Sequence, residues 1–123
     1  MDIRNALASI AVSDIKASRD WYGRLLGAEP AAAPMPGLHE WQFKQGGWLQ
    51  LYEKAEHAGH CAVTLVVDDI EALRAQLRQD GYRGTKDTDG EVTRICILAD
   101  PDGNQVVFAE SLDAERNPSA VAA

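Results

Sequence analysis

The side chains best able to do chemistry in this sequence are two histidines and a glutamate that lie close together in the chain. His57 and His60 are three residues apart, and Glu53 precedes them. Imidazole and carboxylate groups bind divalent cations, and either can act as a general base. Side chains alternate between the two faces of a strand, however, so two residues three apart do not share a face. Residues 54–59 are also predicted to form a loop. We therefore expect polar residues at a loop–strand junction, with ligand contact by His60 or a metal site as alternatives.

Other catalytic patterns are not apparent in the chain. There is no Ser-His-Asp order, no phosphate-binding loop and no pair of facing carboxylates. A base for metal-free catalysis would have to be His60, or Glu53 if the strand register shifted. Cys61 and Cys96 lie inside apolar, strand-like runs. That placement favours buried, unpaired thiols over a disulfide or a reactive thiol.

A tight turn organises the end of the chain. The residues Asp100-Pro101-Asp102-Gly103-Asn104 stand between two apolar runs, 95–98 and 106–108. Pro101 presets the backbone for the second position of a turn, and Gly103 can adopt the positive φ needed to leave it. The pattern predicts a β-hairpin.

The second half of the chain repeats the first. Val12-Ser13-Asp14-Ile15 matches Val67-Asp68-Asp69-Ile70, and the segment from Gly46 to Glu53 matches the segment from Gly103 to Glu110. An internal repeat of this length indicates two copies of one structural unit. We predict an α+β fold in which two tandem β-α-β-β-β modules form a curved mixed sheet around a central cleft.

The expected domain spans residues 1–110, with modules at about 6–53 and 60–110, followed by a flexible tail at 111–123. Ile70, Ala72, Leu73 and Leu77 mark the buried side of the second helix. The expected elements are strands at 7–12, 40–44, 48–53, 61–67, 92–98 and 105–110, helices at 15–26 and 70–79, and edge strands within 28–38 and at 82–85, with a charged loop at 86–90.

Alternation along the strands divides their side chains between a helix side and a cleft side. The cleft side is predicted to be small and apolar, with aromatic and neutral hydrogen-bonding groups, a lining that suits an organic ligand. The sides taken by Trp41, Phe43, Arg94 and Cys96 stay open. The residues predicted to bind ligand are Ser9, Trp48, Gln50, Tyr52, His60, Thr64 and Val107. The residues predicted to pack against the helices are Ile10, Val12, Leu49, Leu51, Val63, Leu65, Val106 and Phe108.

With these motifs in place, residues 6–110 resemble the vicinal oxygen chelate superfamily of glyoxalases, bleomycin-resistance proteins and extradiol dioxygenases. The resemblance rests on the two Val-x-Asp-Ile motifs, on Trp21-Tyr22-Gly23-Arg24-Leu25-Leu26-Gly27 and on the turn at 100–104. It implies the paired-module fold, homodimers and, in many members, a divalent cation held by four side chains.

The positions that match those four metal ligands are Leu7, Gln50, Ala62 and Val107. Leucine, alanine and valine have no donor atom, and a glutamine amide is a poor ligand. The resemblance therefore implies the fold without the metal chemistry, and we expect no metal and no other cofactor. Its metal-free members include bleomycin-resistance proteins.

The composition and charge of the chain favour some classes of function over others. The chain has 123 residues and a formal charge of −7, which disfavours nucleic-acid binding and weakly favours a cationic ligand. No segment suits a membrane span or signal peptide, so we expect a cytoplasmic protein. The favoured function is metal-free binding of a planar or aromatic small molecule, without catalytic residues. Alternatives are a glyoxalase-like lyase, isomerase or dioxygenase with an atypical site, and a regulatory or interaction module.

The purified protein is expected to contain no stoichiometric divalent metal, because three of the four family ligand positions carry no donor atom. Elemental analysis of the protein after gel filtration measures this directly. About one zinc, nickel, iron or manganese per chain, lost on His60→Ala, would contradict the expectation.

Overall fold

The computed structural model describes residues 1–112, which form two helices, eight strands and one short 3₁₀ helix. The chain divides into two compact units. The first contains residues 1–63 together with the turn Asp100–Asn104, and the second contains Thr64–Ala99 and the residues from Gln105 onward. Each unit has one four-stranded sheet and one helix, so the predicted α+β fold with two tandem modules is confirmed. No helix within residues 1–112 is long and apolar enough to cross a membrane.

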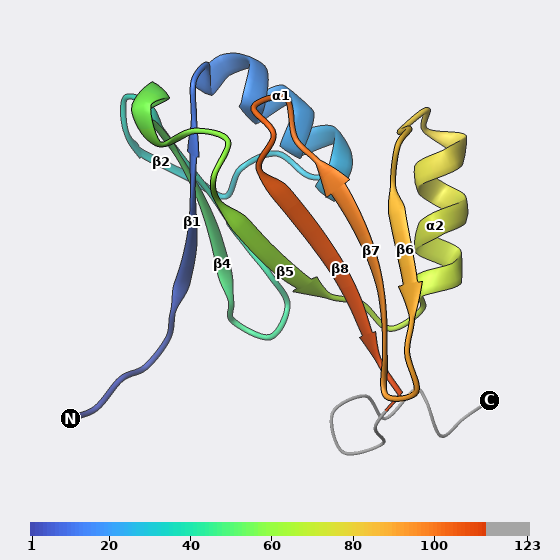
Figure 1. Cartoon of the computed structure of the whole chain (residues 1–123). Helices are drawn as coiled ribbons and strands as arrows, with labels where there is room; N and C mark the ends of the chain where they lie inside the picture. The colour runs from blue at the N-terminus through green and yellow to red at the C-terminus, as the bar shows by residue number, and fades with distance from the viewer. Residues whose placement is uncertain (113–123) are drawn as a thin grey trace. The chain divides into compact units, whose positions relative to one another are not determined.

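The first unit is built on a mixed sheet with the strand order β1-β4-β3-β2. β1 (Leu7–Val12) runs parallel to β4 (Trp48–Glu53), whereas β3 (Leu38–Gln42) is antiparallel to both β4 and β2 (Ala32–Met35). Figure 1 shows β1 and β4 as neighbours. β1 and β4 begin and end where the sequence predicts. β3 is shifted two residues toward the N-terminus, since Phe43 belongs to the turn and its N–H donates to the Gly47 carbonyl.

Helix α1 (Ile15–Leu26) covers one side of this sheet. The Asp14 carboxylate accepts a hydrogen bond from the Ala17 N–H at 3.1 Å and so caps the helix, which ends at Gly27 with a φ of 69°. Its buried side contains Ser18 and Tyr22. The strand residues that complete this core are Ile10, Val12, Trp41, Leu49 and Leu51.

The turn at 100–104 is part of the first unit, where it is held by a buried polar cluster. The Asn104 side chain is fully buried; its Nδ2 donates to the Ala11 carbonyl at 2.9 Å, and its Oδ1 accepts from the N–H groups of Gly59 and Cys61. The Tyr22 hydroxyl donates to Asp100 Oδ2 at 2.8 Å. Burial, reinforced by the Asp100 carboxylate, raises the pKa of Tyr22, which stays protonated as a donor.

The second unit has the strand order β5-β8-β7-β6. Helix α2 spans Ile70–Gln79 as predicted, and the Asp69 carboxylate caps it by accepting from the Ala72 N–H at 3.0 Å. β8 includes Ser111, one residue beyond the predicted strand. Residues 113–123 of the expected tail lie outside the described residues. The strands are β5 (Ala62–Val66), β6 (Lys86–Asp89), β7 (Thr93–Ala99) and β8 (Gln105–Ser111).

Two predictions for the second unit are wrong, one for its edge strand and one for the buried side of α2. The edge strand is the charged segment 86–89 rather than 82–85, and Ala72 is exposed while Arg74 is buried at 7% exposure. Arg74 reaches from α2 to Asp87 and Asp89 of β6, at 3.2 and 2.8 Å. Figure 1 shows α2 alongside β6. These ion pairs hold a polar segment as a strand that propensity alone does not favour.

The ion pairs of this cluster shift the pKa values of Asp89 and Arg74 so that both side chains stay charged. The hydrogen bond from Arg74 is the main cause that lowers the pKa of Asp89, and it also raises the pKa of Arg74. Cys96 lies beneath the cluster on β7, and burial raises the pKa of its thiol to about 11. Cys61 is half-buried, and neither cysteine forms a disulfide within the described residues. Buried, unpaired thiols are therefore confirmed for Cys96.

In each unit, a glutamate at or next to the end of a strand meets the N-terminus of the helix: Glu53 is the last residue of β4, and Glu110 is the last but one of β8. Glu53 accepts a hydrogen bond from the Ile15 N–H at 3.0 Å, and Glu110 accepts one from the Ile70 N–H at 2.5 Å. A carboxylate at this place pairs with an otherwise unsatisfied amide and with the positive end of the helix dipole. Glu53 is exposed, whereas Glu110 is 9% exposed.

Replacing these two glutamates by alanine should destabilise the protein unequally. Glu110→Ala leaves a buried helix N–H without its acceptor, a loss of about 1–3 kcal/mol. Glu53→Ala exposes its N–H to water and should be the milder change. Chemical denaturation followed by circular dichroism measures both. Equal losses would contradict the explanation by burial.

Candidate functional site

The side of the first sheet opposite α1, here called the open face, carries most of the predicted ligand-binding residues. Trp41, Leu49 and Leu51 point toward the helix, so their neighbours in the strands point away from it. Leu7 is 48% exposed on this face, and Ser9 is exposed. Its residues are Leu7, Ser9 and Ala11 on β1, Trp48, Gln50 and Tyr52 on β4, and Leu38, Glu40 and Gln42 on β3.

A row of hydrogen bonds crosses three strands at the middle of the open face. Ser9, Gln50 and Glu40 are cross-strand partners in the register of β1, β4 and β3. The Ser9 hydroxyl donates to Gln50 Oε1 at 3.1 Å, and Gln50 Nε2 donates to Glu40 Oε2 at 2.7 Å. The two contacts fix which end of the Gln50 amide is donor and which is acceptor. Gln50 is thereby a positioned hydrogen-bonding group rather than a free side chain.

Two aromatic side chains stand on either side of this row. Trp48 and Tyr52 lie two residues before and after Gln50 on β4, and both are half-buried. Trp48 is opposite Leu7 and Gln42, whereas Tyr52 is opposite Ala11 and Leu38. Along β4 the open face therefore presents an aromatic, a polar and a second aromatic side chain, each about 6.5 Å from the next.

The structure also settles the side taken by Trp41, which the alternation pattern left open. Its ring lies 6.4 Å from that of Tyr22 in α1, and its indole N–H donates to the Ala28 carbonyl at 2.9 Å. Trp41 is thus a core residue. Its neighbour Glu40 must then face the opposite side, and sequence reasoning missed Glu40 because the strand's orientation was undetermined. Arg94 and Cys96 take the helix side of the second sheet, since Arg94 pairs with Glu71 of α2 and Cys96 is buried.

The family's four metal-ligand positions do not fit a metal ion in this chain. Leu7, Ala62 and Val107 offer no donor atom, and the Gln50 amide oxygen already accepts from Ser9. Within residues 1–112 no three histidine, cysteine, aspartate or glutamate side chains are grouped closely enough to hold a metal.

The alternative base residues take other places in the first unit. Glu53 remains in register opposite Val12, and its carboxylate caps α1. His57 ends the 3₁₀ helix η1 (Ala55–His57), and His60 follows in the exposed loop before β5. Both histidines are exposed, as expected for polar residues at a loop–strand junction. They are not part of the hydrogen-bonded row of Ser9, Gln50 and Glu40.

Thr64 and Val107, the remaining predicted ligand contacts, belong to the second unit. Thr64 is exposed between Val63 and Leu65, and Val107 is half-buried opposite Ile97, between the buried Val106 and Phe108. Both therefore lie on the side of the second sheet that α2 does not cover. Val66, on the same side of β5 as Thr64, is 73% exposed.

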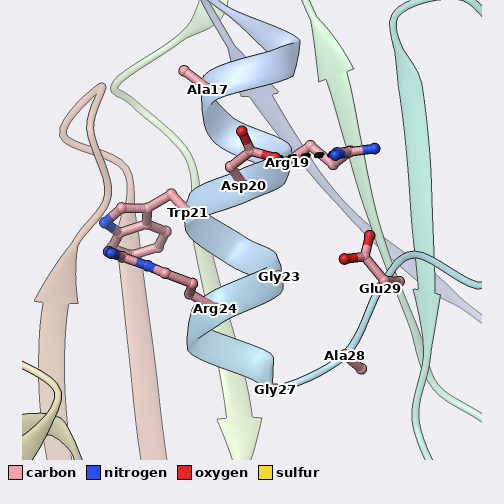
Figure 2. A pocket seen from close by; sticks show the side chains of 9 residues that line it. All are labelled: Ala17, Arg19, Asp20, Trp21, Gly23, Arg24, Gly27, Ala28 and Glu29. Carbon is pink, nitrogen blue, oxygen red and sulfur yellow. Dashed lines mark hydrogen bonds and ion pairs between the residues drawn. The ribbon is translucent and has the colours of Figure 1, made fainter.

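A separate hollow of about 670 Å³ lies on the outer side of α1. Its walls are exposed helix residues, among them the ion pair of Arg19 and Asp20, and Glu29 beyond the helix. Figure 2 shows the Arg24 side chain running beside the Trp21 indole at one edge. Most of these side chains are exposed, in contrast to Gln50 on the open face, which is half-buried and held by two hydrogen bonds.

The family can now be assigned from comparison with known proteins. The model of the Glyoxalase/Bleomycin resistance protein/Dioxygenase superfamily matches residues 5–108. The chain belongs to this superfamily. A crystal structure titled glyoxalase/bleomycin resistance protein from Catenulispora acidiphila is similar at 36% identity and a TM-score of 0.78, covering 86% of this chain and 96% of that one.

Two further solved structures are alike in fold. TnmS3, titled an antibiotic binding protein from a Streptomyces species, has 23% identity and a TM-score of 0.76, covering 89% of this chain and 97% of its own. A bleomycin resistance determinant encoded on the transposon Tn5 has 18% identity and a TM-score of 0.69, covering 89% and 98%. A search of curated proteins gave no match. The vicinal oxygen chelate resemblance inferred from the motifs is confirmed.

Proposed function

We propose that the protein is a metal-free binding protein that sequesters a planar or aromatic small molecule, as antibiotic-resistance members of the superfamily do. The observation that carries the proposal is the neutral amide of Gln50, held in place at a metal-ligand position by Ser9 and Glu40. An amide in this setting retains a donor and an acceptor for a ligand but does not attract a metal cation. The aromatic rows of Trp48 and Tyr52 supply stacking surface on both sides of it.

The named relatives support the same class of function. One structure of this fold is titled an antibiotic binding protein and another a bleomycin resistance determinant. The protein at 36% identity is named a glyoxalase/bleomycin resistance protein. Fold alone does not define a ligand, so the proposal depends on the side chains of the open face.

A catalytic function has less support from the side chains. Glu53 has a structural partner in the Ile15 N–H, and His60 lies in an exposed loop. Neither side chain contacts the hydrogen-bonded row on which a ligand would lie. The residues proposed as ligand contacts are Ser9, Trp48, Gln50, Tyr52 and His60 in the first unit and Thr64 and Val107 in the second.

We also infer a homodimer located in the cytoplasm, with no nucleic-acid or membrane partner. Apolar side chains are exposed on the helix-free side of the second sheet, where Val66 is 73% exposed. Ile95 and Ile97 of β7 are half-buried on that side. Uncovered apolar sheet surface of this kind is stabilised by contact with a second copy.

Truncating Trp48 or Tyr52 to alanine should weaken ligand binding by roughly two- to tenfold each, because an aromatic stacking contact contributes about 0.5–1.5 kcal/mol beyond burial. Glu53→Gln should leave affinity unchanged. A tryptophan-fluorescence screen against planar antibiotics and aromatic metabolites identifies the ligand, and calorimetry compares the variants. An affinity that ignores Trp48, Gln50 and Tyr52 but is lost with Glu53→Gln or His60→Ala would show that the open face is not the site.

Light scattering at micromolar concentration should give the mass of two chains. Val66→Asp places a charge on the proposed apolar interface and should produce monomers. Val92→Asp is the matched control, since Val92 is 68% exposed but lies in the β6–β7 turn. A monomeric wild-type protein, or equal dissociation by both substitutions, would contradict the assignment.

A further inference from the structure

Glu40 is a carboxylate without a cationic partner on the open face. It is half-buried on β3 and accepts a single hydrogen bond, from the Gln50 amide to its Oε2. The ion pairs found within residues 1–112 involve Arg19, Arg74 and Arg94, and none includes Glu40. Among the β1, β3 and β4 residues of this face, Glu40 is also the only aspartate, glutamate, lysine or arginine.

Covering this face with a ligand removes water from that carboxylate. A charge that is dehydrated without a partner costs several kcal/mol, so a neutral ligand would bind against a penalty. A ligand that carries a cationic N–H group replaces the lost water with a charge-assisted hydrogen bond. The second carboxylate oxygen, Oε1, has no hydrogen bond to the described residues and is the atom available for that contact.

The flanking aromatic rows favour the same ligand. The ring faces of tryptophan and tyrosine attract cations, and the attraction strengthens when the site is shielded from water. Trp48 and Tyr52 lie on either side of the row that contains Gln50 and Glu40. A flat cation can therefore stack on one ring while its N–H group reaches the carboxylate.

We propose that Glu40 is the specificity-determining residue of the open face, and that it selects planar organic cations bearing an N–H donor, such as a protonated amine, amidinium or guanidinium. The proposal rests on the binding function proposed above. It differs from the general attraction of cations to a protein with a net charge of −7, because it assigns the selection to one position.

Three acridines test the proposal because they share one ring system. Proflavine is a cation with N–H donors, N-methylacridinium is a cation without them, and acridine is neutral at mildly alkaline pH. Their dissociation constants are measured by calorimetry for wild type, Glu40→Gln and Glu56→Gln. Glu56 is exposed in η1, so its substitution makes the same change in net charge away from the open face.

Wild type should bind proflavine most tightly, N-methylacridinium less tightly and acridine least. Glu40→Gln should weaken proflavine binding by roughly ten- to a hundredfold, the range of a charge-assisted hydrogen bond. Acridine should bind the same variant more tightly than wild type, because the neutral ligand no longer buries an unpaired carboxylate. Glu56→Gln should leave all three affinities near wild type. Thermal melting of each variant confirms that it is folded.

The outcomes separate this proposal from the one on which it rests. If all three acridines bind equally, weaken with Trp48→Ala and ignore Glu40→Gln, the binding face is correct and the role of Glu40 is wrong. If proflavine and N-methylacridinium bind alike, the requirement for an N–H donor is wrong. Equal losses in Glu40→Gln and Glu56→Gln would assign the effect to net charge. If none of the acridines binds to the wild-type protein, both proposals fail.

Discussion

The first unit depends on the hydrogen bonds of one buried side chain, Asn104. Its amide bonds the Ala11 carbonyl of β1 and the N–H groups of Gly59 and Cys61, three backbone groups that would otherwise be buried or half-buried without partners. Asp100, bound to Asn104 and to Tyr22, continues the cluster into α1. Gly59 is close enough to this turn that a Cβ atom would come within 2.7 Å of the Asp102 carbonyl oxygen. The cluster thus fixes β1 and so the row that contains Ser9.

The alternation of side chains along β4 places its structural residues and the residues proposed to bind ligand on opposite sides of the sheet. Glu53 lies an odd number of residues from Gln50, so it faces the helix side and caps α1, while Gln50 faces away. Glu110 and Val107 have the same relation in β8. The structural carboxylate is kept in both copies of the repeat, whereas the residue on the opposite side is an amide in one and a valine in the other. Stability and ligand chemistry can therefore change independently along one strand.

Local signals made the helices and most strands predictable. Asp14 and Asp69 mark the starts of both helices, and each caps its helix as the residue type suggests. β6 could not be predicted, because its strand form depends on Arg74, which is close to Asp87 only after folding. The shared side of Trp48, Gln50 and Tyr52 followed from alternation. Glu40 did not, since its side of the sheet depends on the packing of Trp41 against Tyr22. Alternation shows which residues of a strand share a side of the sheet, but it does not show which side packs against the core.

The position of the 100–104 turn has a consequence for synthesis on the ribosome. The first unit comprises residues 1–63 and this turn, with most of the second unit between them in the sequence. The chain emerges from its N-terminus, so β1 and the loop at 59–61 exist for some time before Asn104 is made. During that interval the Ala11 carbonyl and the Gly59 and Cys61 N–H groups lack their Asn104 partner. The earlier half of the duplicated sequence is therefore completed by residues that are translated only after Thr64–Ala99 of the later half.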